Sequence, residues 1–379
     1  MEGVANRHRP APRPDRRNQA EVSGMRVPAK LAGHRGNAEQ RSSVADDGIA
    51  ALLGVWLIAG VYADGWAHLN VGGLDSFFTP WHGALYGGFT ALTAWLAWMT
   101  WRRKQPGRSW RDAIPAGYRQ GVVGVAVFAA GGVADMVWHL VFGVEAGVDA
   151  LVSPTHLVLL VGGTLLLSSP LRAVLQRSGA LPRRVTDAWP AAVSLATMTA
   201  LAGFFLSYVS VFAQPTATMP LTSIPEGAPG HLEAELPATV GLAGYLIGTA
   251  LIVVPLLLAR RRGPLPAGTV ALVVTFVAVP AAALSEMRWA VPAIAAVGAS
   301  LVVELLLRAL PAASAVTLAV GVPGAVWSGQ LIGLALAGDL GWGVEMWAGV
   351  VVLTTLAGYL LAVVAGANDR PRTSAGMAG

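Results

Sequence analysis

Long apolar stretches separated by short polar connections occupy most of the chain. A helix rises about 1.5 Å per residue, so about 20 apolar residues are enough to cross a hydrocarbon core of roughly 30 Å. Inside a bilayer no water satisfies the backbone, and continuous apolar runs of this length therefore predict helices. We expect about ten spans, with approximate boundaries at 48–68, 81–101, 119–142, 154–175, 188–213, 237–259, 268–285, 289–309, 312–336 and 346–366.

The composition is typical of a protein that lies in a membrane. Hydrophobic residues make up 54% of the 379 residues and charged residues only 12%, a balance that is unusual for a water-soluble domain. The predicted fold class is therefore all-α, a polytopic transmembrane helical bundle whose surroundings are the lipid bilayer. The basic residues behind the net charge of +5 gather in tails and loops, so we expect no nucleic acid partner.

The distribution of basic residues predicts how the spans are oriented. Short cytoplasmic loops retain Lys and Arg, and one set of connections holds nearly all of them. With the N-terminus inside the cell, only Arg288 of the 26 basic residues lies outside. We therefore expect a multi-pass protein of the cell membrane with both termini in the cytoplasm. The segments placed inside are the N-terminal tail, 101–111, 172–184, 260–262, Arg308, Arg370 and Arg372.

The same patterns divide the chain into four regions. Residues 1–46 are rich in Arg, Pro and Gly without helical or strand periodicity, which predicts a disordered basic cytoplasmic tail. Residues 47–175 contain a duplicated hairpin that carries the candidate metal ligands. Residues 176–366 hold additional transmembrane helices, and residues 367–379 form a cytoplasmic C-terminal tail.

Two segments of the hairpin region resemble each other. The first is VYADGWAHLNVGGLDSFFTPWH, residues 61–82, and the second is GVADMVWHLVFGVEAGVDALVSPTH, residues 132–156. In both, an Asp is followed four residues later by a His, and then by a glycine-containing connector, an Asp, a Ser or Thr before Pro, and a second His. Paired glycines follow each copy within about two helical turns. The repetition predicts two matched helical hairpins.

Helix geometry predicts that each copy brings one Asp and two His together. The Asp and the His that are four apart share one helix face. The hydroxyl residue before Pro suits an N-cap and the Pro suits the first helical position, so the later His falls in the first turn of the returning helix. Hairpin closure then moves this His toward the Asp–His pair. The residues brought together are Asp64, His68 and His82 in the first copy and Asp135, His139 and His156 in the second.

These residue types suit a metal ion near the outer face of the membrane. Imidazole and carboxylate ligands bind copper, zinc and non-haem iron, and the chain has no cysteine that would offer a thiolate. The other three histidines, His8, His34 and His231, lie in the tail and in an outer loop. The alternative interpretation is that the Asp and His side chains are satisfied by one another, by the backbone or by water.

The hairpins resemble the C subunit of the copper-dependent membrane monooxygenases, the particulate methane and ammonia monooxygenases, over about residues 60–165. In that subunit an Asp-xxx-His box precedes a segment like DxSFTPxH, and an Asn-xxx-His box precedes an acidic residue and SPxH. Here DGWAH with DSFFTPWH is similar to the first, and DMVWH, Glu145 and SPTH are similar to the second, with Asp135 in place of Asn. The resemblance implies copper bound by Asp64, His68 and His82 and by Asp135, His139 and His156, supported by Asp75, Asp149 and Glu145.

The leading hypothesis is a copper-binding integral membrane protein that activates dioxygen to oxidise a small apolar substrate, as the resemblance implies. The ligand chemistry by itself also fits zinc or non-haem iron. A metal uptake or transport protein is the second hypothesis, and a non-catalytic membrane subunit is the third. The sequence identifies no catalytic residue, and a homo-oligomer or partner membrane subunits fit all three hypotheses.

Overall fold

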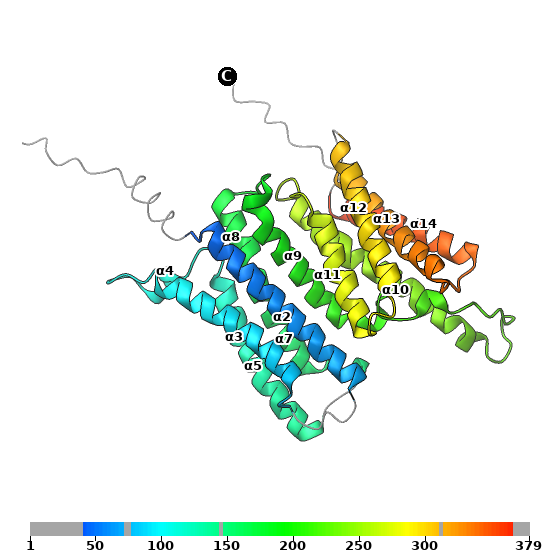
Figure 1. Cartoon of the computed structure of the whole chain (residues 1–379), viewed down its shortest axis with the longest axis horizontal. Coiled ribbons are helices and arrows are strands. Elements are labelled where there is room, and N and C mark those ends of the chain that lie inside the picture. The colour runs from blue at the N-terminus through cyan, green and yellow to red at the C-terminus, as the bar shows by residue number, and fades with distance from the viewer. Residues whose placement is uncertain (1–40, 72–76, 144–146, 311–313, 367–379) are drawn as a thin grey trace, which may run out of the picture. The chain divides into compact units, whose positions relative to one another are not determined.

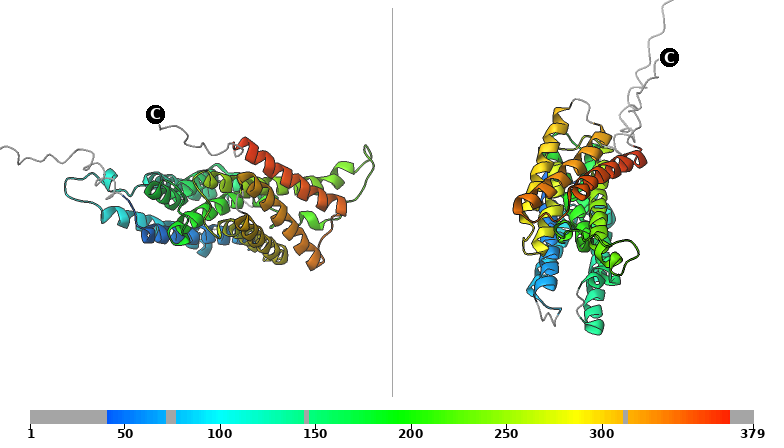
Figure 2. Two further views of the ribbon diagram at one scale, coloured as in Figure 1. Left: turned by 90° about the horizontal axis from the view of Figure 1, so that it is seen from above. Right: turned by 90° about the vertical axis from the view of Figure 1, so that its right-hand side faces the viewer.

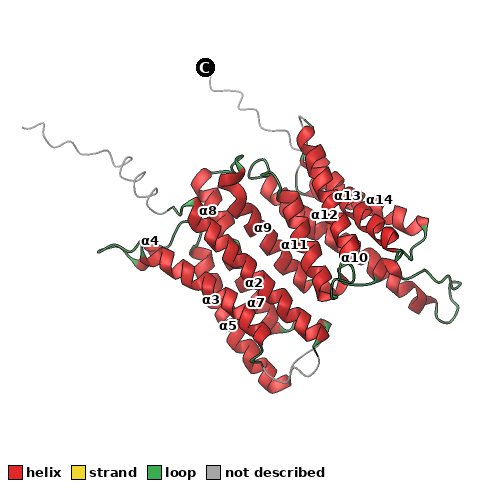
Figure 3. Cartoon of the chain, viewed as in Figure 1, coloured by secondary structure: helices red, strands yellow, loops and turns green. Residues whose placement is uncertain are grey.

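The computed structural model describes residues 41–71, 77–143, 147–310 and 314–366. Two of the residues expected to support the ligands, Asp75 and Glu145, lie outside the described residues, as do the tails 1–40 and 367–379. The described part of the chain is built from helices joined by loops and contains no strand (Figure 3). The predicted all-α class is confirmed.

Eight helical segments within the described ranges are long and apolar enough to cross a membrane. These are α2 (Val44–Asn70), α5 (Arg119–Phe142), α7 with α8 (Pro154–Leu167 and Ser169–Ser178), α9 (Val185–Phe205), α10 (His231–Arg260), α12 (Ala290–Ala309), α13 (Ala315–Ala337) and α14 (Val344–Val364). A transmembrane helical bundle is therefore supported, whereas the count of ten spans is not confirmed.

The two other predicted spans form helices that differ from these eight. The helix α3 (Pro80–Trp101) has 22 residues, but its Trp, Thr and Gly residues make it less apolar. The helix α11 (Thr269–Leu284) is apolar but has only 16 residues. The short helices α4 (Trp110–Ala113) and α6 (Val148–Val152) lie in connections between longer helices.

The two hairpins pack on a common helix, α9, which contacts both α2 and α7. Helices α2 and α3 pair along their length, and α5 pairs in the same way with α7. Helix α9 packs on α2, and α11 packs on both α9 and α2. Helices α10, α12, α13 and α14 form the other part of the bundle, with α9 and α11 between the two parts (Figures 1 and 2).

Glycine allows close contact between the helices of each hairpin. A Cβ atom added at Gly60 of α2 would lie 2.6 Å from the backbone of α3, and one at Gly88 of α3 would lie 2.7 Å from the backbone of α2. In the second hairpin, a Cβ at Gly124 or Gly162 would lie 2.7 or 2.5 Å from the backbone of the opposite helix. Small residues at such contacts let helix backbones approach closely in a membrane.

A buried ionic network fixes the first turn of α2. Asp47 is fully buried and accepts hydrogen bonds from Ser42 (2.6 Å), Tyr118 (2.9 Å) and Arg177 (2.6 Å). Burial and the neighbouring Asp47 carboxylate raise the pKa of Tyr118, so its hydroxyl stays protonated as a donor. Asp47 thereby links the start of α2 to the start of α5 and the end of α8.

The adjacent Asp46 extends this network to α3. Its carboxylate pairs with Arg102 at the end of that helix and with Arg103, whose Nη2 atom lies 2.9 Å from Oδ2. Asp46 also completes a capping box with Ser43, the N-cap residue of α2. Helix α2 therefore begins at Val44, inside the region 1–46 that the composition assigns to a tail. The sequence pattern gave no indication of these ion pairs, because each joins residues far apart in the chain.

The connection between α9 and α10 is folded against the bundle. It contains the short 3-10 helices η2 (Ser207–Val209) and η3 (Thr216–Thr218), and it buries Val211, Phe212 and Ala217. Helix α10 then begins at His231, earlier than the predicted boundary at 237. This connection therefore has side chains in contact with the helices, and part of it faces the site described below.

Candidate metal centre

The first hairpin brings one carboxylate and two imidazoles together. Asp64 and His68 lie on one face of α2 near its end, with Oδ2 of Asp64 3.8 Å from Nε2 of His68. Thr79 caps α3 by accepting the backbone N–H of His82 at 3.1 Å, and Pro80 is the first helical residue. This start of α3 directs His82 toward α2, where its Nδ1 lies 3.5 Å from Oδ1 of Asp64.

The second hairpin repeats this arrangement with shorter contacts. Nε2 of His139 lies 3.5 Å from Oδ2 of Asp135, and Nε2 of His156 lies 3.3 Å from Oδ1 of the same carboxylate. Ser153 caps α7 and accepts the backbone N–H of His156. Thr155 donates a hydrogen bond of 2.8 Å to Oδ1 of Asp135, which holds the carboxylate in place.

The two ligand sets lie against each other. His82 of the first hairpin forms a second group with Asp135 and His139 of the other hairpin, in which the potential ligand atoms lie within 4.8 Å of one another. The ring centroid of His139 lies 6.3 Å from that of His68 and 6.3 Å from that of His82. The two sets that the sequence assigns to separate hairpins therefore form one continuous group, which we call the His–Asp cluster and which comprises Asp64, His68, His82, Asp135, His139 and His156.

Hydrogen bonds orient two of the imidazole rings. Nδ1 of His139 lies 3.2 Å from the carbonyl oxygen of Gly143, and Nδ1 of His156 contacts the carbonyl oxygen of Ala150. A ring that donates its Nδ1–H to a carbonyl has its lone pair on Nε2, the atom that faces Asp135 in both cases. Such hydrogen bonds are typical of metal-binding histidines, because they fix both tautomer and ring orientation.

The burial of the cluster agrees with a bound cation. Asp135 is only 1% exposed, and His82 and His139 are each 7% exposed. Oδ1 of Asp64 is buried and makes no hydrogen bond within the described ranges. Because a buried carboxylate is costly unless its charge is paired or coordinates a metal, these side chains fit a metal ion. They could equally hold copper, zinc or iron by ligand type alone.

The one expected supporting residue that the structure describes lies apart from the cluster. Asp149 is exposed in α6, and it belongs to neither of the groups of potential ligand atoms. Thr155 was not identified from the sequence, although its place in the SPTH motif, two residues after the cap, could have indicated a hydroxyl directed at the cluster.

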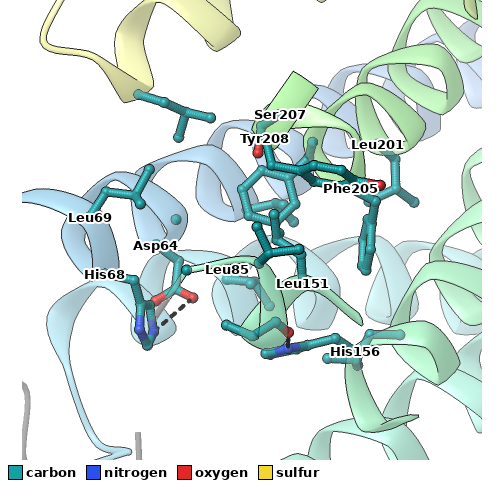
Figure 4. Close-up of a pocket in the computed structure, with 18 of the residues that line it drawn as sticks. Asp64, His68, Leu69, Leu85, Leu151, His156, Leu201, Phe205, Ser207 and Tyr208 are labelled. Atoms are coloured by element: carbon teal, nitrogen blue, oxygen red, sulfur yellow. Dashed lines mark hydrogen bonds and ion pairs between the residues drawn. The ribbon is translucent and has the colours of Figure 1, made fainter. Parts of the chain in front are cut away.

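A cavity of about 320 Å³ opens beside the cluster. Most of its wall is apolar and comes from α2, α3, α5, α6, α7, α9 and α11. Figure 4 shows Asp64 and His68 on one side of the view and His156 on the other, with Leu85 and Leu151 between them, and Ser207 and Tyr208 above all of these. The apolar wall residues are Val61, Leu69, Leu85, Phe128, Val148, Leu151, Leu159, Leu201, Phe204, Phe205 and Leu284.

Comparison of the chain with known protein families, with curated proteins and with solved structures gives no match.

Proposed function

We propose that the chain is a copper-binding integral membrane protein that activates dioxygen to oxidise a small apolar substrate. One observation carries this proposal: two overlapping groups, which together hold three imidazoles and two carboxylates and which His156 joins through its contact with Asp135, gather beside an apolar cavity. The ligand types suit copper, zinc and non-haem iron, and the resemblance of the hairpins to the C subunit of copper-dependent membrane monooxygenases favours copper.

The six residues of the His–Asp cluster would hold the metal, and bound copper would supply one-electron redox chemistry with dioxygen. The aspartates offset positive charge, and the hydrogen bonds at Nδ1 of His139 and His156 keep their Nε2 atoms available. Oxygenation of a C–H bond places one oxygen atom in the product and releases the other as water, which consumes two electrons and two protons. The proposal therefore includes an external electron donor, such as a partner membrane subunit.

The interior of α2 argues against a continuous ion path through the bundle. Such a path would need polar groups that continue from the cluster toward the other end of the helices, whereas a transporter that rocks around a fixed site would not. Between Asp47 and Asp64 the buried positions of α2 are apolar or glycine, except for Tyr62, whose hydroxyl donates to the carbonyl oxygen of Ala200. These positions are Gly48, Ala50, Ala51, Gly54, Leu57, Ile58, Gly60, Val61 and Tyr62.

The metal content of the purified protein tests the proposed cluster. We expect about two copper ions per chain, one for each carboxylate with its two imidazoles. The His68→Ala variant should lose the copper ion beside Asp64. The His139→Ala variant should have a lower copper content than the His68→Ala variant, because the His139 ring adjoins both ligand sets. His231→Ala is the matched control, since His231 begins α10 and contacts the carbonyl oxygen of Ile224 instead.

A protein that takes up no copper on titration would overturn the proposal. Copper-loaded protein should then consume oxygen in the presence of a reductant and an apolar substrate, and the His139→Ala variant should not. If the wild type binds copper without substrate-dependent oxygen consumption, the enzymatic part of the proposal is wrong and a carrier is favoured.

A further inference from the structure

We propose that the cavity binds an elongated, largely apolar molecule of about ten to fourteen non-hydrogen atoms with a single uncharged polar end, such as a medium-chain alcohol. The apolar end faces the His–Asp cluster, and the polar end faces Ser207, Tyr208 and Gln214. As a statement about the substrate this inference rests on the proposed function, but the binding itself is separable from it.

The size of the cavity indicates the size of its occupant. A cavity of about 150 Å³ lined by Leu, Ile and Phe holds one benzene molecule. The cavity beside the cluster, at about 320 Å³, has roughly twice that space. A molecule with one heavy atom, such as methane or ammonia, would fill only a small part of the cavity. Most of the apolar wall would then make no van der Waals contact with the ligand, and those contacts are what would bind it.

The chemistry of the wall indicates the polarity of the occupant. Apart from the cluster itself, the wall residues that the structure describes include no carboxylate, imidazole, Lys or Arg side chain. Its polar side chains are Tyr86, whose ring stacks on His82 beside the cluster, and Ser207, Tyr208 and Gln214 farther from it. The last three offer hydroxyl and amide groups that both donate and accept hydrogen bonds. A hydroxyl or carbonyl group fits these partners, whereas an isolated charge would be left without a counter-ion.

The position of these polar groups indicates the direction in which the molecule lies. Ser207 and Tyr208 lie above the labelled residues of the His–Asp cluster in Figure 4, and apolar side chains separate the two polar sets. This part of the wall belongs to the connection between α9 and α10, outside the duplicated hairpins. This gives the region 176–366 a specific role, which is to set the length and polarity of the bound molecule.

Photolabelling of the full-length protein in lipid nanodiscs tests this inference. The probe is 1-octanol carrying a diazirine, and a matched probe is the same diazirine on octane without the hydroxyl. We expect octanol adducts on residues 201–214, reduced by excess 1-octanol and unaffected by dissolved methane. Leu201→Trp, which fills the cavity, should reduce these adducts several-fold, whereas Leu305→Trp on the exposed face of α12 should leave them unchanged.

A second variant separates hydrogen bonding from loss of folding. The double variant Ser207→Ala with Gln214→Ala should reduce labelling by the octanol probe several-fold and leave labelling by the octane probe nearly unchanged. Equal labelling of the cavity and of lipid-facing positions, or labelling that 1-octanol does not reduce, would overturn the inference.

The copper content of the same samples distinguishes this failure from failure of the proposed function. Cavity labelling in a protein that binds no copper supports this inference and contradicts the proposed function. Copper binding without cavity labelling contradicts this inference and leaves the proposed function standing.

Discussion

The negative charges of the three aspartates of α2 are paired with different kinds of side chain. Asp46 and Asp47 pair with arginines at the start of the helix. Near its end, Asp64 faces only imidazoles among its ion-pair contacts, and its Oδ1 atom makes no hydrogen bond in the described part of the chain. The first two therefore serve the packing of α2, whereas Asp64 has a coordination site still available for a cation.

The two N-cap hydroxyls offer a test at the scale of single residues. Thr79 and Ser153 accept the backbone N–H of the following His and also lie 3.0 and 2.9 Å from Nδ1 of its ring. We expect Thr79→Val and Ser153→Ala each to lower the free energy of unfolding by about 1 kcal/mol. Copper affinity should fall roughly tenfold, because the ring loses a group that orients it.

Thermal unfolding and competitive copper titration measure these two effects. Ser314→Ala is the matched control, because Ser314 caps α13 in the same way without contacting a histidine. It should cost similar stability and leave copper affinity unchanged. An equal loss of copper affinity in Ser314→Ala would show that the effect arises from general destabilisation.

Local residue patterns could predict part of the site. The four-residue spacing in α2 and α5 and the hydroxyl–Pro pairs before α3 and α7 fix which face or turn each ligand occupies, and the structure has these caps and pairs. The group that combines His82 with Asp135 and His139 could not be predicted. It depends on how the two hairpins pack together, and helical periodicity carries no information about that.

At the scale of helices, the glycine contacts control how closely each hairpin closes. We expect Gly88→Ala to destabilise the protein by about 1 to 3 kcal/mol, because the new Cβ would overlap the backbone of α2. Copper content should fall as well, since α3 carries His82. Gly83→Ala on the same helix is the control, because a Cβ there has nothing within 4 Å.

Unfolding temperature and metal content of the two glycine variants are the measurements. A Gly88→Ala protein as stable and as metal-rich as Gly83→Ala would mean that α2 and α3 can separate without disturbing the cluster. The repeated pattern that includes the paired glycines predicted two matched hairpins, but the positions that face these glycines on the opposite helix, such as Leu57 and Leu85, came only from the structure.

At the scale of the whole molecule, the basic residues predict which ends of the helices face the cytoplasm. The chain has no cysteine, so single introduced cysteines report their own position. We expect Ser178→Cys, at the exposed end of α8, to react with a membrane-impermeant maleimide only after cells are opened. Ser223→Cys, in the connection before α10, should react in intact cells. Reversed labelling would contradict the predicted orientation.

The lengths of the apolar runs predicted the helical bundle well, but they predicted the helices and connections of the region 176–366 incompletely. The run at 268–285 was apolar enough to suggest a span, yet α11 has only 16 residues. The predicted span 188–213 was too long, because α9 ends at Phe205, and nothing in the sequence indicated that Ser207, Tyr208 and Gln214 line the same cavity as the hairpin ligands. Contacts between segments this far apart in the chain follow from three-dimensional packing.

The position of His82 makes the two copies of the hairpin interdependent. Its ring adjoins Asp64 of its own copy and the Asp135–His139 pair of the other. A chain that ended after α3 would therefore keep the three candidate ligands of the first hairpin without the side chains of the second hairpin that lie beside them. A change of spacing in either copy would alter the surroundings of the candidate ligands in both, so neither hairpin works as a separate unit.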